Sequence, residues 1–128
     1  MALELGNVIG KVGGGGDVIR DPLGGEYSGA EFSTLRTITV SNPSFVAAHV
    51  EHSQSGSYLG YGEPAPVIQI TSEDTVISFM TPSTSKSNYT QPMRVTAVVG
   101  PGTYQIKFTA ATKRVITLQN LNISIVPV

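Results

Sequence analysis

The sequence contains no cysteine and no tryptophan, and only 13% of its 128 residues are charged. Without cysteine, the chain cannot form disulfides, thiolate zinc sites or cysteine nucleophiles. Charged residues usually make up about 25% of a soluble domain, and here serine and threonine, thirteen of each, take much of that share. A surface rich in hydroxyl groups repels itself only weakly, which suits a protein that packs against neighbours.

The few charges form no patch that would define a partner. The net charge is −1, and lysine and arginine do not occur in runs, so the electrostatic footprint of a nucleic-acid-binding protein is missing. No apolar run approaches the roughly 18 residues of a transmembrane helix. Met1 to Glu4 do not start a basic region followed by an apolar core, so no signal peptide is expected. We therefore expect neither nucleic acid nor membrane as a partner.

Glycine is distributed unevenly along the chain. Nine of the 14 glycines lie in the first 29 residues, including the run from Gly13 to Gly16. A chain of this length usually forms one domain, which buries roughly two thirds of its unfolded surface. We therefore divide the chain into a glycine-rich N-terminal arm, residues 1–34, and a folded domain, residues 35–128.

The arm carries apolar residues that a simple linker would not need. Glycine loses the most backbone entropy on ordering, so the arm needs other contacts to hold one shape. Two interpretations remain open: the apolar residues dock onto another subunit, or they form short edge strands on the chain's own sandwich. The candidate partner-binding residues are Leu3, Leu5, Val8, Ile9, Val18, Ile19 and Leu23.

The folded domain reads as a series of short strands. In residues 103–109, apolar Tyr104, Ile106 and Phe108 alternate with polar residues, which indicates a strand with one dry face. We expect residues 35–40 and 45–50 to form a hairpin, and the last third of the chain to form a meandering or Greek-key sheet. The predicted strands are 35–40, 45–50, 67–70, 75–80, 93–99, 103–109, 115–118 and 121–125.

Turn signals separate these strands at the spacing of roughly 8–12 residues that is typical of sandwiches and barrels. No segment shows a period of 3.6 residues, so no helix is predicted. The predicted fold is therefore all-β: an antiparallel two-sheet sandwich, jelly-roll-like, with a glycine-rich N-terminal arm.

The histidines offer the main candidate for metal chemistry. On a strand, His49 and Glu51 face the same side, and His52 follows at the strand end. Two imidazoles and a carboxylate can bind zinc or copper, but the spacing supplies no further ligand, and a polar rim at the strand end also explains the pattern. No nucleophile lies in a Gly-x-Ser-x-Gly context. We expect no catalytic residue, no metal site, no cofactor and no enzymatic activity.

Two long loops carry the tyrosines that could face a ligand. Tyr58 and Tyr61 flank a glycine in one loop, and Tyr89 lies in the other. Flat tyrosine rings can stack on sugars or pack into a protein partner. The alternative is that one ring caps the core and the other is incidental, and the missing tryptophan weakens a sugar platform. Glycan binding is therefore the alternative function, with these three tyrosines as its candidate residues.

Three segments resemble phage proteins. Residues 101–108 (PGTYQIKF) and 121–128 (LNISIVPV) resemble the closing strands of jelly-roll modules in tailed-phage virions, such as capsid decoration (cement) proteins, head fibres and tail modules. Carbohydrate-binding modules share this pattern. Residues 5–10 (LGNVIG) resemble the start of tail and fibre proteins that a short apolar N-terminus anchors to the particle.

The resemblance carries over no catalytic residue. It implies a non-enzymatic structural protein, located in the virion, that binds and stabilises other virion proteins, namely capsid or tail subunits. Its arm and its sandwich surface would make these contacts, and the chain would be a homo-oligomer.

Overall fold

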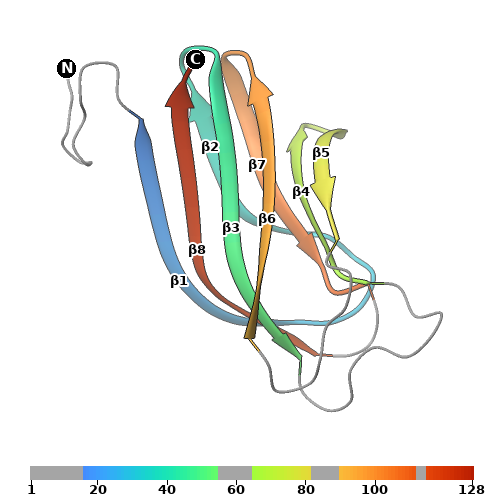
Figure 1. The fold of residues 1–128 in the computed structure, drawn as a ribbon. Helices are drawn as coiled ribbons and strands as arrows, with labels where there is room; N and C mark the ends of the chain where they lie inside the picture. Colours follow the sequence, from blue (N-terminus) through green and yellow to red (C-terminus); the bar gives the residue numbers. More distant parts are fainter. Residues whose placement is uncertain (1–15, 55–64, 82–89, 112–114) are drawn as a thin grey trace.

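The computed structural model describes residues 16–54, 65–81, 90–111 and 115–128. These ranges form strands without a helix, which confirms the all-β prediction (Figure 1). No helix that could cross a membrane occurs in the part of the chain that the structure describes. The strands are β1 (Asp17–Tyr27), β2 (Ser33–Val40), β3 (Ser44–Gln54), β4 (Val67–Ser72), β5 (Thr75–Met80), β6 (Thr90–Val99), β7 (Gly102–Thr109) and β8 (Ile116–Pro127).

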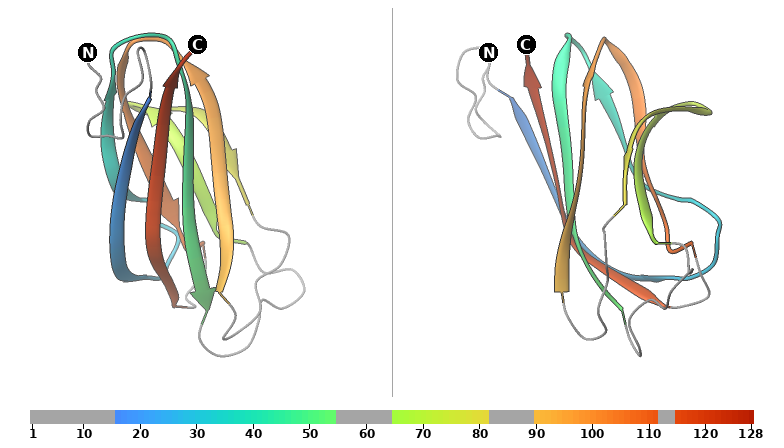
Figure 2. Two further views of the ribbon diagram at one scale, coloured as in Figure 1. Left: turned by 60° about the vertical axis from the view of Figure 1, so that its left-hand side comes forward. Right: turned by 45° about the vertical axis from the view of Figure 1, so that its right-hand side comes forward.

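The strands form two four-stranded sheets that pack face to face (Figure 2). Sheet A has the order β1-β8-β3-β6 and sheet B the order β2-β7-β4-β5, and neighbouring strands are antiparallel. The first strand pairs with the eighth, the second with the seventh, the third with the sixth and the fourth with the fifth. One long antiparallel ribbon wrapped around a core gives this pairing, which is that of a jelly roll.

The core lies between the sheets and takes alternate residues from each strand, because successive side chains of a strand point to opposite faces. The buried residues of β7 follow the predicted alternation, with one exception. Thr109 was expected on the wet face but is buried, since its Oγ1 donates to the Gly29 carbonyl at 3.2 Å and accepts from the Ala111 amide at 3.0 Å. The largest fully buried side chains include Phe108, Ile68, Ile70, Met93, Ile106, Ile116, Leu118, Leu121 and Ile123.

Two predicted pairings were wrong. β2 and β3 do not form a hairpin, because the turn between them carries the chain from sheet B to sheet A. The last third of the chain is likewise divided, with β6 and β8 in sheet A and β7 in sheet B. An apolar face shows that a strand is half buried, but two such strands can face each other across the core as well as share a ladder. β4 and β5, by contrast, do pair with each other as a hairpin.

Strand β8 joins two predicted strands, residues 115–118 and 121–125, into one. Strand β1 supplies the missing eighth strand, and it lies within the segment predicted as an arm. Gly16, just before β1, packs closely on β8. A Cβ at this position would clash with the Ile125 carbonyl oxygen. For residues 17–27, the interpretation as an edge strand of the chain's own sandwich is therefore the right one.

The apolar arm residues divide into two groups. Ile19 and Leu23 of β1 pack partly buried against the core, whereas Val18 is exposed on the outer face of sheet A. Leu3, Leu5, Val8 and Ile9 lie outside the described residues, so their role stays a prediction.

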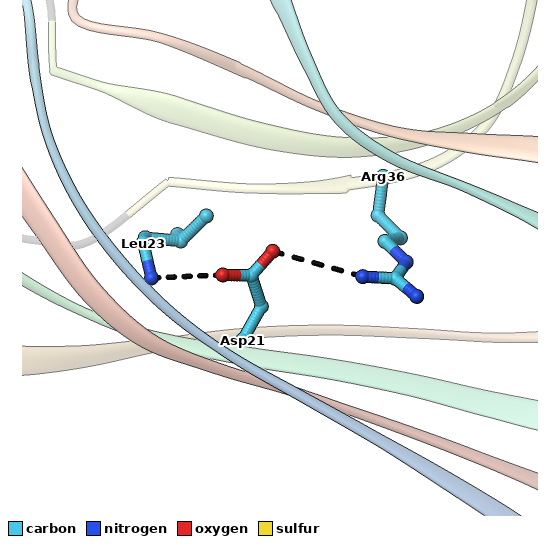
Figure 3. A network of polar contacts seen from close by, with 3 residues as sticks. All are labelled: Asp21, Leu23 and Arg36. Atoms are coloured by element: carbon cyan, nitrogen blue, oxygen red, sulfur yellow. Dashed lines mark hydrogen bonds and ion pairs between the residues drawn. The ribbon is translucent and has the colours of Figure 1, made fainter.

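Asp21 shapes β1 and links it to the opposite sheet (Figure 3). Its Oδ1 accepts a hydrogen bond of 2.9 Å from the Leu23 amide, which closes an Asx turn over Pro22. Leu23 and Gly24 then adopt positive φ angles of 57° and 81°, and the β1–β8 register shifts there. The other carboxylate oxygen lies 3.7 Å from Nη1 of Arg36 on β2. One side chain therefore forms the bulge and bridges the edges of the two sheets.

We expect Asp21→Ala to lower the free energy of unfolding by about 1–2 kcal/mol, because both a hydrogen bond and a partly exposed ion pair are lost. Asp21→Asn keeps an oxygen for the Leu23 amide and should lower it by less. Urea denaturation followed by circular dichroism measures both. Asp17→Ala, an exposed position on the same strand, is the matched control, and equal losses for Asp17→Ala and Asp21→Ala would contradict this account.

Candidate interaction surface

The outer face of sheet A is exposed, and the strand registers arrange its side chains in rows. At one end, Phe45 of β3 lies opposite Val98 of β6 and Val126 of β8. Val98 is 66% exposed and Val126 45% exposed. We call these three residues the apolar row. With strands about 4.8 Å apart, its three side chains span about 10 Å.

Two further rows follow along the strands. The next one contains Thr96, Ala47, Ser124 and Val18, side chains that are small or short. The one after that, the basic row, crosses all four strands with Arg94, His49, Asn122 and Arg20. The face therefore changes from apolar to basic over about 13 Å, given a rise of about 3.3 Å per residue.

A second apolar surface lies on β5, the edge strand of sheet B. The β4–β5 register shifts between Ile70 and Thr71, which leaves Ile77 as an extra residue in β5. Ile77 and Phe79 share the outward face, and Phe79 is 62% exposed. Val76 is also exposed. Exposed apolar patches on soluble proteins commonly mark interaction sites, and the described strands carry two of them, on different sheets.

A cleft lies between the edge strands β1 and β2. It has a volume of about 380 Å³, with Ile19, Ile38 and Ile125 among its lining residues and Asp17 and Arg36 beside them. The sandwich is open on this side, because β1 and β2 pair with β8 and β7 and not with each other.

The structure separates the three residues that were considered for metal binding. His49 and Glu51 share the outer face of β3, but His52 points inward and is fully buried. Among the described residues, no group of three or more histidine or acidic side chains is close enough to hold a metal ion. The other candidate residues, Tyr58, Tyr61 and Tyr89, lie outside the described residues.

His52 is an unusual member of the core. Neither Nδ1 nor Nε2 has a hydrogen-bond partner among the residues that the structure describes, although buried polar groups normally do. Its register partners are Leu118 of β8 and Gln91 of β6. Burial disfavours the charged imidazolium and lowers the pKa of His52 below its usual 6.5. His52 is therefore neutral in the folded protein at pH 7.

Sequence reasoning missed the apolar row. In β3, the odd-numbered positions that begin at Phe45 and the even-numbered positions that begin at Val46 have similar compositions. Each set contains a large apolar residue, an alanine and a histidine. The pattern alone does not decide which set faces the core, so Phe45 was not identified as a surface residue.

We expect the protein to lose stability as the pH falls below about 6.5. The unfolded chain, with its ordinary histidine pKa, binds a proton at a higher pH than folded His52 does. Between these two pKa values, protons favour the unfolded state. His52→Leu should flatten the dependence of thermal stability on pH in this window, whereas His49→Ala, at the only other histidine, should retain it. An unchanged pH profile in His52→Leu would contradict the account.

These observations come from the chain alone. No protein-family model matches the sequence, and no curated protein matches it.

Proposed function

We propose that this chain is a non-enzymatic structural protein of a viral particle, of the tailed-phage kind, that binds and stabilises capsid or tail subunits. The observation that carries the proposal is the apolar row on the outer face of sheet A, in which Val98 and Val126 are exposed and Phe45 is half-buried between them. The topology supports it, since jelly rolls build viral capsid domains, although lectins and cupins also use them.

The arrangement of the apolar surfaces supports a particle more than a simple dimer. A two-fold dimer uses one self-complementary patch. Here the apolar row lies on sheet A, whereas Ile77 and Phe79 lie on β5, the edge strand of sheet B. A protein that contacts one neighbour through each surface fits into a repeating array, where many modest contacts add up to tight attachment.

The regular strand register beneath the apolar row also supports this mechanism. The β3–β6 ladder runs from Ser44–Val99 to Ser53–Thr90 without a register shift, so sheet A is regular below the apolar row. The row beside it is small, with Ala47 at its centre. A partner subunit can therefore approach closely and cover Phe45, Val98 and Val126 together. Burying such side chains contributes about 25 cal/mol per Å² of apolar surface.

The N-terminal residues supply a second attachment in this proposal. Leu3, Leu5, Val8 and Ile9 precede β1 and are joined to it by Gly13 to Gly16. A segment of twelve residues, such as Leu5 to Gly16, can reach about 40 Å when extended. This reach is enough to cross a subunit boundary. The same proposal includes that the chain forms a homo-oligomer and that it is located in the virion.

The test is incorporation into particles. In the virus that encodes the chain, Val98→Asp combined with Val126→Asp should reduce the copy number per purified particle at least tenfold, because a charge would be buried in the contact. Quantitative mass spectrometry of purified particles measures this number. Thr39→Asp, on the exposed side of β2, is the control and should incorporate normally. Particles that lack the wild-type chain, or that hold the double variant at the normal copy number, would contradict the proposal.

A further inference from the structure

The end of sheet A opposite the apolar row is irregular. Where His49 pairs with Asn122 and Glu51 with Gln119, the β3–β8 register shifts, so β8 carries one more residue than β3. Asn120 lies in this bulge with a positive φ of 58°, a backbone conformation that asparagine tolerates better than most residues. The β1–β8 register also shifts nearby, at the Asp21 turn.

The bulge presents two consecutive amides on the outer face, where a regular strand would present one. Asn120 Nδ2 donates to Glu51 Oε1 at 3.0 Å, and Gln119 Nε2 donates to the same oxygen at 3.4 Å. Asn122 Nδ2 donates to the Asn120 carbonyl at 3.3 Å. The carboxylate of Glu51 is thus held in place by side chains of the next strand.

A surface hollow of about 350 Å³ lies beside these amides, between β1 and β8. This volume is within the range of small-molecule sites. Its lining includes the exposed Arg20, which offers up to five N–H donors, with Asn120 and Asn122 on the opposite strand and Pro22 beside them. A guanidinium and two side-chain amides therefore line the hollow together with Asp21, Pro22 and Leu121. Glu51 is not part of the lining and is hydrogen-bonded to Asn120.

We propose that this hollow binds a carbohydrate ring. Each sugar hydroxyl both donates and accepts hydrogen bonds, so its recognition requires donors and acceptors side by side. Arg20 supplies donors, and the side-chain amides of Asn120 and Asn122 supply both. The hydrogen bonds that fix Asn120, Gln119 and Glu51 reduce the conformational entropy that binding would cost.

The basic row extends the site beyond the hollow. His49 and Arg94 continue from Asn122 across β3 and β6, so a second sugar ring can lie across the strands toward them. This proposal uses none of the tyrosines considered from the sequence, and it does not depend on the particle contacts proposed above.

A glycan array probed with the full-length protein tests the proposal. We expect binding to at least one saccharide, with affinity then measured by isothermal titration calorimetry. Arg20→Ala should weaken that affinity at least tenfold, and Asn122→Ala should weaken it as well. Lys107→Ala removes a cation from β7 of sheet B, outside the hollow and the basic row, so it should retain affinity within about threefold. Circular dichroism and thermal denaturation check that each variant is folded.

Several results would overturn the carbohydrate site. These are an array on which the wild-type protein binds nothing, wild-type affinity in Arg20→Ala, or an affinity that is lost in Tyr58→Ala with Tyr61→Ala but kept in Arg20→Ala. Val98→Asp with Val126→Asp leaves the hollow intact and should bind the saccharide normally. The failure of this proposal and the failure of the particle proposal are therefore distinguishable.

Discussion

Strand β8 is hydrogen-bonded along both of its edges, and sheet A depends on this double ladder. On one side it carries β1, which has no other partner in the sheet, and on the other it carries β3. Its inward side chains Leu118, Leu121 and Ile123 are fully buried in the core. Sheet A therefore cannot close until the last strand of the chain is in place. Such long-range pairing makes folding slow compared with that of helical proteins of similar size.

The sequence predicted the fold class because most strands bury one continuous face. In β7, Tyr104, Ile106 and Phe108 point inward without interruption, so the period of two was visible. β1 was harder to identify, since the charged Asp21 takes an inward position among Ile19 and Leu23 and is compensated by Arg36 of the other sheet. An edge strand that is stabilised by a tertiary ion pair does not carry the apolar pattern of a central one.

The errors in strand boundaries and pairing have a common physical basis. Gln119 and Asn120 interrupt the apolar pattern, and this was interpreted as a turn between two strands, whereas it is a bulge within one. The same residues fit either structure, because bulges and turns both favour positive φ angles. Similarly, the sequence between β2 and β3 cannot distinguish a hairpin turn from a crossing between sheets. The surface sites depend on these pairings, so their residues could not be grouped before the registers were known.

The regularity of the ladders gives the two ends of sheet A different shapes and therefore different chemistry. Around Phe45 the β3–β6 and β3–β8 ladders are in register, so the sheet is smooth and its side chains form one apolar surface. A smooth surface suits another protein, because a large area can be covered at once. Around Asn120 the ladders shift, consecutive polar side chains turn outward, and a hollow forms beside Arg20. A hollow with fixed polar groups suits a small polar ligand. Both surfaces therefore follow from where β8 keeps its register and where it loses it.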